Sequence, residues 1–353
     1  AWIPIAMPIL VWFLSAIIMD VSLGLFAYQL FAVSEKLPFP SALPPAQAVI
    51  VLTGETEKMS GRLRLMCVCA FASIIYCLVA YGVNFVAGAY GYVVQPIPVP
   101  WSDWNIYLHL WLPGASLGIA TDLAIFATGL ILPFSVCAGM FIGSFALYFV
   151  GNFLLVTLDL TTFAKEWSFG MSVASAWERS IIHAWACPLV SASIAVGIVP
   201  LLRHPESIIN TFKAMRGSAK ELEIGMPLWL PLLTFLGGAV GLSVYIYTLA
   251  PQFPIWITLL LNVGWVFFYS LIAGRATGVA MPFSVPYMRE LTLASSNYAG
   301  YDIWFTPMHT VPASGNWCNF FKICQLTGCS PMSLVKAVIL IWPTALILSL
   351  IHI

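Results

Sequence analysis

The sequence predicts an all-α, polytopic membrane protein, and three observations lead to that class. Of the 353 residues, 61% are hydrophobic and only 8% are Asp, Glu, Lys or Arg, against about 25% charged residues in soluble domains. The mean hydropathy is +0.94, so the chain cannot cover a water-facing surface with polar groups. Long apolar runs recur, most of them near the ~20 residues that a helix needs to cross a bilayer. This composition excludes a soluble enzyme, a nucleic-acid binder and a disordered chain.

About eight crossings are expected, within a single integral membrane domain over residues 1–353. Pro133 interrupts the third apolar run, residues 117–157, and divides it into two arms that we count as two crossings of a broken-helix hairpin. With those two arms, the expected spans are 4–33, 65–92, 117–132, 133–157, 174–202, 227–249, 255–273 and 334–353.

Lys and Arg fall mainly on one side of this scheme. Alternating the spans places twelve of the 14 basic residues in the segments 34–64, 203–226 and 275–336. Only Lys165 and Arg179 fall on the other side. Because cytoplasmic segments carry the excess of Lys and Arg in membrane proteins, this bias predicts that Ala1 is extracytoplasmic. It also requires residues 117–157 to enter and return as a hairpin.

Residues 281–333 are the least regular stretch. They are too polar for a lipid-facing helix and too apolar for a solvated loop. Non-helical backbone at membrane depth must be buried in protein or line a cavity, so we predict a re-entrant or cavity-lining segment. If its end is helical, Asn319, Lys322 and Gln325 share one face at a spacing of three residues. A cytoplasmic amphipathic helix with a wet polar face is the other interpretation of that spacing.

An isolated carboxylate, Asp20, lies near the middle of the first span. Ionisable residues inside a membrane span are costly and by default functional, so Asp20 is a candidate for ion coupling as a proton carrier. It could instead pair with a buried base such as Arg275, or accept a structural hydrogen bond from neighbouring backbone. The sequence leaves these three interpretations open.

Other polar and aromatic residues indicate interfaces rather than chemistry. Glu178, Arg179 and His183 lie at the entrance of one span and are interpreted as an interfacial polar collar. Trp and Tyr crowd the uncharged loop 93–116, as an interface anchor or a substrate clamp would. The eight Cys form no C-x-x-C pair, the five His show no metal-ligand spacing, and common catalytic motifs are absent. We expect no enzyme activity, no cofactor and no metal site.

Three stretches together resemble the oligopeptide transporter (OPT) superfamily, which includes the yellow-stripe-like metal-chelate carriers. Residues 36–41 (KLPFPS) are similar to the family's Leu-x-[Phe/Tyr]-Pro segment, and residues 129–135 (GLILPFS) are similar to its broken-helix element. The similar pieces in the last part of the chain are residues 273–278 (AGRATG), 314–322 (SGNWCNFFK) and 326–331 (LTGCSP). Their order and spacing favour the prokaryotic OPT-like branch.

The resemblance implies a multi-pass secondary transporter of the cell membrane that moves small peptides or peptide-like metal chelates with an ion gradient. It implies a substrate path at Pro133 and Ser135 on the broken helix, at Arg275, and along the polar C-terminal helix, with Asp20 as the ion-coupling residue. The path residues expected on that helix are Ser314, Asn316, Asn319, Lys322 and Gln325.

Two departures from the family pattern support an alternative. Val279 and Ala280 replace the acid that follows the Gly of Arg-x-x-Gly, and Asn319 stands in a helix that is acid-rich in peptide and chelate carriers. The chain is also shorter than family members and begins at Ala1 without Met, so we expect missing N-terminal spans or a further subunit. A homodimer is the other expected assembly, in a lipid bilayer and without nucleic acid. The alternative function is a non-transporting structural or accessory subunit with an OPT-like fold.

Overall fold

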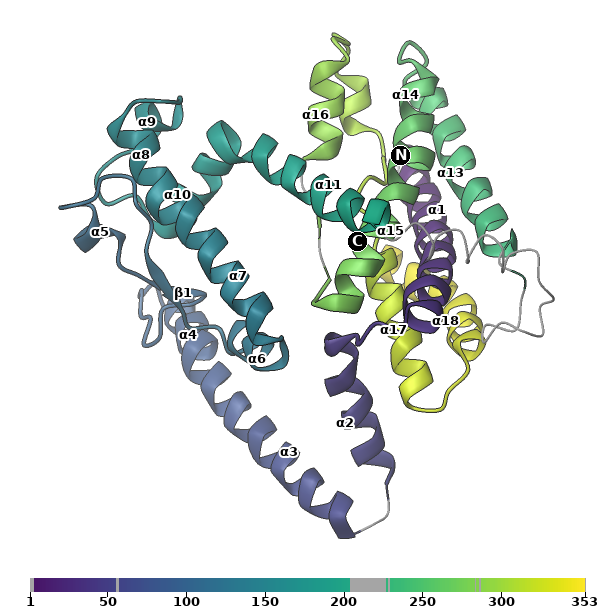
Figure 1. The fold of residues 1–353 in the computed structure, drawn as a ribbon, viewed down its shortest axis with the longest axis horizontal. Helices are drawn as coiled ribbons and strands as arrows, with labels where there is room; N and C mark the ends of the chain where they lie inside the picture. The colour runs from purple at the N-terminus through teal and green to yellow at the C-terminus, as the bar shows by residue number, and fades with distance from the viewer. Residues whose placement is uncertain are drawn as a thin grey trace. The chain divides into compact units, whose positions relative to one another are not determined.

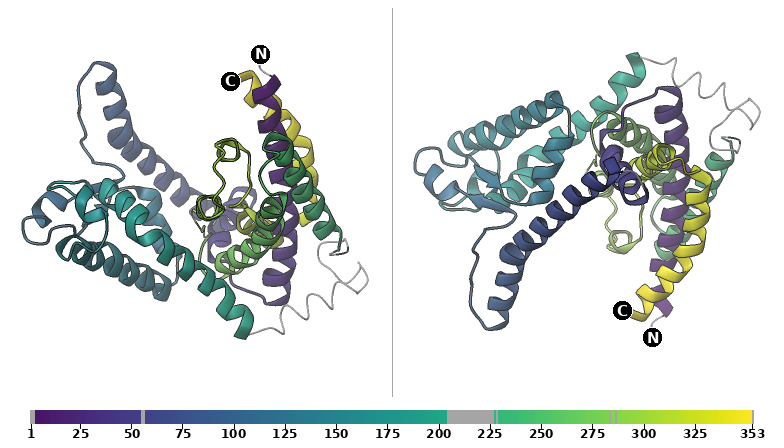
Figure 2. Two further views of the ribbon diagram at one scale, coloured as in Figure 1. Left: turned by 90° about the horizontal axis from the view of Figure 1, so that it is seen from above. Right: turned by 90° about the horizontal axis from the view of Figure 1, so that it is seen from below.

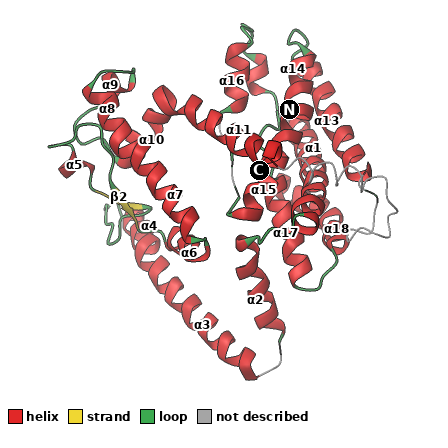
Figure 3. Cartoon of the chain, viewed as in Figure 1, coloured by secondary structure: helices red, strands yellow, loops and turns green. Residues whose placement is uncertain are grey.

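The computed structural model describes residues 3–54, 57–203, 227, 229–282, 284–285 and 287–352. The chain is about 74% helical with almost no strand (Figure 3). Six helical stretches among the described residues are long and apolar enough to cross a membrane: Met7–Ser34, Ser60–Ala89, Phe134–Thr157, Trp229–Leu249, Ile255–Val279 and Pro331–Leu348. These features fit the all-α, multi-pass membrane class that the composition predicts. The count of eight crossings stays a prediction.

The chain folds as two compact units, which are described separately. The first unit comprises Ala1–Ala46 and Val190–Ile353, and the second comprises Gln47–Leu189. Two helices extend across the boundaries between them, α2 (Leu43–Thr53) and α11 (Ala186–Arg203). A single membrane domain over residues 1–353 stays a prediction.

The first unit is a bundle of long helices joined by shorter helical turns (Figure 1). Its α-helices are α1 (Ile3–Ala27), α13 (Trp229–Leu249), α14 (Ile255–Leu259), α15 (Val266–Val279), α16 (Met288–Ser295), α17 (Ser314–Leu326) and α18 (Pro331–His352). Helix α1 continues as a π-helical segment over Tyr28–Ser34, and a second π-helical segment, Leu260–Trp265, joins α14 to α15. Two 3-10 turns, Pro40–Ala42 and Asp302–Phe305, complete the unit.

Helix α1 lies at the centre of this unit and contacts α13, α15 and α17. The Ser22 hydroxyl bonds that of Thr234 at 2.8 Å, and Gly238, further along α13, lies beside Met19, so α13 runs antiparallel to α1. The first turns of α18 pack near Phe31, and Trp342 on α18 meets Phe13. Helix α18 is therefore antiparallel to α1 as well, as the views from above and below show (Figure 2).

Small residues let α17 approach its neighbours closely, as is typical of helix contacts in membranes. A Cβ atom at Gly24 of α1 would lie closer than 3.0 Å to the Cβ atom of Trp317. A Cβ atom at Gly315 would lie 2.9 Å from the Thr277 hydroxyl on α15. Helix α17 is thus wedged between α1 and α15 at positions where only glycine fits.

The segment between α15 and α17 runs from one end of the first unit to the other and back. Helix α15 ends beside the C-terminal end of the α1 span, where the Phe39 N–H donates to the Gly278 carbonyl at 2.8 Å. Tyr298 packs edge-on against Phe253, in the turn that follows α13, at the opposite end. Arg289 therefore lies at the end of the unit opposite Arg275. This segment crosses the bundle and is not a surface loop at one end, so Arg289 lies apart from Arg275. The assignment of every basic residue of 275–336 to one side of a membrane stays a prediction.

The second unit carries shorter helices and one two-stranded sheet. Its α-helices are α3 (Glu57–Cys77), α4 (Val83–Ala89), α5 (Asn105–Leu108), α6 (Leu123–Ile131), α7 (Phe134–Ser144), α8 (Asn152–Thr157), α9 (Phe163–Glu166) and α10 (Val173–Ser180). The π-helical segments Leu78–Gly82, Phe145–Gly151 and Ile181–Trp185 join consecutive helices into longer ones. The strands β1 (Trp101–Asp103) and β2 (Gly118–Ala120) pair antiparallel, with Ser102 opposite Ile119.

The helix of residues 117–157 is broken at Pro133, as the sequence predicts. Helix α6 ends at Ile131, Leu132 and Pro133 are extended, and α7 begins at Phe134. The Cys137 thiol donates to the Gly129 carbonyl across the break, at 3.6 Å. Because α6 has only nine residues, its length of about 14 Å is half of the hydrocarbon thickness. The first arm is therefore too short to cross a bilayer as a helix.

Hydrogen bonds from three polar side chains join two loops of the second unit. The Asp103 carboxylate accepts from the Val173 N–H at 2.7 Å, and the Asn105 amide donates to the Met171 carbonyl at 3.0 Å. His109 accepts from the Gly170 N–H through Nδ1, and its Nε2 lies 3.1 Å from the Ala115 carbonyl. That pattern requires the neutral imidazole with its proton on Nε2. Burial lowers the pKa of His109 below its ordinary value of 6.5.

The polar collar of the second unit has a partner that the sequence did not indicate. Glu166 on α9 lies 3.6 Å from Arg179 and 3.1 Å from His183. His183 also contacts the Thr162 hydroxyl at 2.7 Å through Nδ1. The spacing of four residues between Arg179 and His183 allows both to reach the same carboxylate.

Candidate functional site

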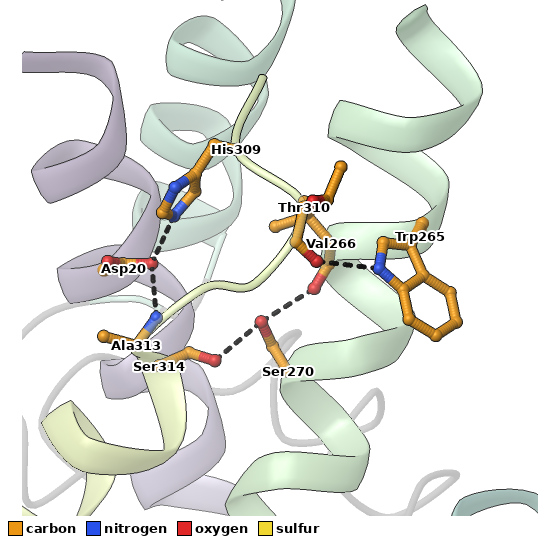
Figure 4. Close-up of polar contacts among 8 residues, drawn as sticks. All are labelled: Asp20, Trp265, Val266, Ser270, His309, Thr310, Ala313 and Ser314. Carbon is orange, nitrogen blue, oxygen red and sulfur yellow. Dashed lines mark hydrogen bonds and ion pairs between the residues drawn. The ribbon is translucent and has the colours of Figure 1, made fainter. Parts of the chain in front are cut away.

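The candidate site is a buried carboxylate–imidazole pair inside the first unit. Asp20 lies on the third quarter of α1, and one of its oxygens, Oδ1, is 2.8 Å from His309 Nε2. The same oxygen accepts from the Ala313 N–H at 3.0 Å. The side chain of Asp20 is only 10% exposed and that of His309 only 8%. Figure 4 shows the pair where the extended segment before α17 passes α1.

This extended segment, residues 306–313, is largely buried although it is not helical. Pro307 and Pro312 have no N–H to satisfy, and residues before proline favour extended backbone, as Thr306 does with ψ 147°. The Trp265 indole donates to the Thr310 carbonyl at 2.8 Å. Backbone that cannot bond within a helix is thus held by side chains from α1 and from the start of α15, as membrane depth requires.

Two serines continue the polar interior beyond Asp20. The Ser314 hydroxyl donates to that of Ser270 at 2.8 Å, and the Ser270 hydroxyl donates to the Val266 carbonyl at 2.7 Å. Both side chains are buried. Asp20, His309 and this serine pair form a polar centre where α1, α15 and the start of α17 meet (Figure 4).

Asp20 contacts His309 and backbone, whereas Arg275 is held elsewhere. Arg275 donates through Nη1 to the carboxylate of Glu35, at the other end of the span, and both side chains are largely buried. The suggestion that Asp20 pairs with Arg275 was therefore wrong. The physical reason is position: Arg275 lies five residues after Ser270 on α15, away from the polar centre and next to the segment that follows α1.

The polar residues of α17 do not all lie together: they differ in the face of the helix that they occupy and in their distance from the polar centre. Ser314 joins the polar centre, while Asn316 is exposed. Asn319 accepts from the Ser41 hydroxyl at 3.1 Å, and Lys322 donates to Gln325 at 2.8 Å. The row predicted from the spacing of residues 319, 322 and 325 does occur on a helix. It lies further along α17 than the contacts of Asp20.

The remaining two residues of the expected path belong to the second unit. Pro133 lies between α6 and α7, and Ser135 lies in the first turn of α7; both are exposed. Their role in a path stays a prediction.

His309 and Trp265 are functional candidates that the sequence reasoning missed. A lone His was set aside because it had no metal-ligand spacing. The informative signal was its context, since it follows Pro307 in a segment already expected at membrane depth, where an ionisable side chain needs a partner. Among the described residues, no group of three or more His, Cys, Asp or Glu could hold a metal ion.

A second buried polar pair lies where α13 meets the start of α15. The Asn262 amide donates to the Ser243 hydroxyl at 3.1 Å, and this hydroxyl bonds the Ala239 carbonyl at 2.8 Å. Asn262 belongs to the π-helical segment Leu260–Trp265, a geometry that is often found at functional sites. Its amide oxygen is buried without a hydrogen-bond partner.

Comparison with known proteins leaves the family of this chain unassigned. No family profile, no curated protein and no solved structure matches it.

Proposed function

We propose that the chain is an OPT-like secondary transporter of the cell membrane, moving small peptides or peptide-like metal chelates with an ion gradient. The resemblance of its sequence motifs supports the substrate class. The single observation that supports transport is the buried Asp20–His309 pair. Ionisable side chains inside a helix bundle often mark proton relays in membranes, and here one of them, His309, lies on non-helical backbone of the kind that lines transporter sites.

In this proposal the pair holds and releases the coupling proton. An ionised Asp20 beside a neutral His309 with its proton on Nε2, and an ionised Asp20 beside a protonated His309, differ by one proton. Both states keep a hydrogen bond, because the Ala313 N–H continues to donate to Asp20. Helix α17 begins one residue later, so the proton would alter the contacts at the start of this polar helix.

Uptake into proteoliposomes tests the proposal. We expect saturable accumulation of labelled di- or tripeptides, or of a peptide-like metal chelate, that increases with an inward proton gradient. Asp20→Asn and His309→Gln should reduce the gradient-dependent part at least tenfold. Asp159→Asn, at an exposed carboxylate of the second unit, is the matched control. Absence of flux with every substrate, with or without a gradient, would sink the transporter proposal.

A non-transporting accessory subunit with an OPT-like fold is the second candidate. The observation in its favour is the ion pair of Arg275 with Glu35. This pair occupies Arg275, a residue that the transporter proposal places on the substrate path. Co-purification from native membranes distinguishes the two functions. A stoichiometric complex with unrelated subunits favours the accessory role, and a homodimer favours the transporter.

A further inference from the structure

A cavity of about 450 Å³ lies next to the Asp20–His309 pair, toward the N-terminal end of α1. Trp12 on α1, Arg289 and Glu290 on α16, and His309 with Thr310 on the extended segment contribute to its wall. The Trp12 ring meets His309 edge-on, with 6.4 Å between ring centres. The volume of this cavity falls in the range of small-molecule sites, which are commonly 300–1,000 Å³.

Two hydrogen-bond donors on residues of this wall are buried without a partner. They are the indole N–H of Trp12 and the Nε–H of Arg289. Both groups donate only, so neither can be satisfied by another donor. Because nearly all buried polar groups in folded proteins are paired, two unpaired donors on one cavity wall indicate a ligand with acceptor oxygens.

The charge of Arg289 favours an anionic group on that ligand. Arg289 donates through Nη2 to the Trp304 and Thr306 carbonyls, which fix its guanidinium without neutralising it. None of the ion pairs found within 4.0 Å among the described residues includes Arg289. Planar guanidinium groups match carboxylates well. Glu290 at the same cavity places a negative charge where it suits an amino group.

We propose that this cavity binds a small zwitterionic ligand, such as an amino acid or short peptide, by its carboxylate. Arg289 and Trp12 are the donors to the carboxylate, and Glu290 faces the amino group. The inference deepens the proposed function and rests on it for the link to transport, since His309 belongs to both the cavity wall and the proton-binding pair.

Equilibrium binding to the purified full chain, in detergent free of phospholipid, tests the assignment. The probes are labelled alanine, dialanine and trialanine, each competed with its unlabelled acid or its C-terminal amide. At least one acid should bind saturably, and its amide should compete about 10-fold or more weakly, because the amide removes the charge that Arg289 recognises. Equal competition by acid and amide, or no binding of all three acids, would overturn the proposal.

Variants locate the binding in the cavity. Arg289→Gln should weaken binding of the acid about 10- to 100-fold, and Trp12→Phe, which removes only the N–H from a similar ring, about 5-fold. Arg62→Gln, at an exposed arginine of the second unit, is the matched control. Thermal unfolding of each variant must match that of the parent chain. If Trp12→Phe and Arg289→Gln both fold and bind normally, the cavity is not the site.

Uptake measurements and lipid vesicles distinguish failure of this inference from failure of the transporter proposal. Binding with no uptake in proteoliposomes would contradict the transporter and leave the carboxylate site standing. Uptake of a peptide that is unaffected by Arg289→Gln would leave the transporter standing and contradict the site. Vesicles of phosphatidylglycerol that protect the chain from thermal unfolding through Arg289, while the acids do not, would assign the cavity to a lipid headgroup and overturn the proposal.

Discussion

At the scale of single residues, the interior of the first unit is organised by Asp20. A carboxylate away from water is costly unless it is paired and hydrogen-bonded. Asp20 meets both conditions at one oxygen, with His309 Nε2 at 2.8 Å and the Ala313 N–H at 3.0 Å. The same side chain therefore holds the extended segment before α17 through two hydrogen bonds.

Asp20→Leu should destabilise the chain strongly, because it leaves His309 and the Ala313 N–H buried without an acceptor. We expect the free energy of unfolding to fall by about 3 kcal/mol. Asp20→Asn keeps an acceptor oxygen, and its cost should be about 1 kcal/mol. Unfolding in detergent, followed by helical circular dichroism, measures both. Equal stability of the two variants would show that the carboxylate does not hold this segment.

His109 makes the second unit sensitive to acid. Its Nδ1 accepts from the Gly170 N–H, so a protonated ring cannot keep this bond, and burial lowers the pKa of His109 in the folded chain. A group whose folded pKa is below its unfolded value of 6.5 stabilises the fold above pH 6.5. That contribution is lost as the pH falls from 6.5 through the folded pKa.

We therefore expect the unfolding temperature of the chain to fall on acidification below about pH 6.5, and His109→Gln to flatten that dependence. The amide of Gln can donate and accept at similar positions but does not titrate. Unfolding measured from pH 5 to 8 tests this for both chains. An identical pH dependence in the variant would contradict the role of His109.

At the scale of elements, α17 is positioned by glycines on both sides. Gly24→Ala should destabilise the bundle by about 1–3 kcal/mol, because the new methyl would overlap Trp317 unless the two helices separate. Gly241→Ala is the matched control on α13, where nothing lies within 4 Å of the added Cβ. It should be neutral or stabilising by up to about 1 kcal/mol. Comparable losses in the two variants would argue against close packing of α17.

The segment between α15 and α17 was predictable in kind but not in path. Its mixture of Pro, Gly and isolated charges indicates buried or cavity-lining backbone, and residues 306–310 are buried apart from the half-buried Pro307. The contact of His309 with Asp20 joins residues 289 positions apart, and local composition carries no information about such a pair. The pairing of Arg275 with Glu35 could not be predicted for the same reason.

At the scale of the whole molecule, the class follows from composition, whereas the number of crossings depends on local detail. An 8% charged content suffices to predict a membrane protein. The crossing assigned to residues 117–132 depended on apolar length alone, yet residues 118–120 form a strand and α6 has only nine residues. Hydropathy reports solubility in the bilayer, and the backbone conformation near Pro133 decides the length of the helix.

The path of residues 280–313 predicts that Asn297 and Gly328 face opposite sides of the membrane. Both are exposed, and they lie near opposite ends of the first unit. With the exposed native Cys replaced by Ser, Asn297→Cys and Gly328→Cys should react with an impermeant maleimide from different sides of sealed vesicles. Labelling of both from the same side would contradict this arrangement and restore a single surface loop.

The most direct test of the central claim is proton movement with substrate in proteoliposomes loaded with a pH-sensitive dye. If Asp20 and His309 carry the coupling proton, dialanine or another transported peptide added outside should acidify the lumen. The signal should vanish in Asp20→Asn and persist in Asp159→Asn. Substrate entry with no change of internal pH, or equal acidification by the Asp20→Asn variant, would contradict the account.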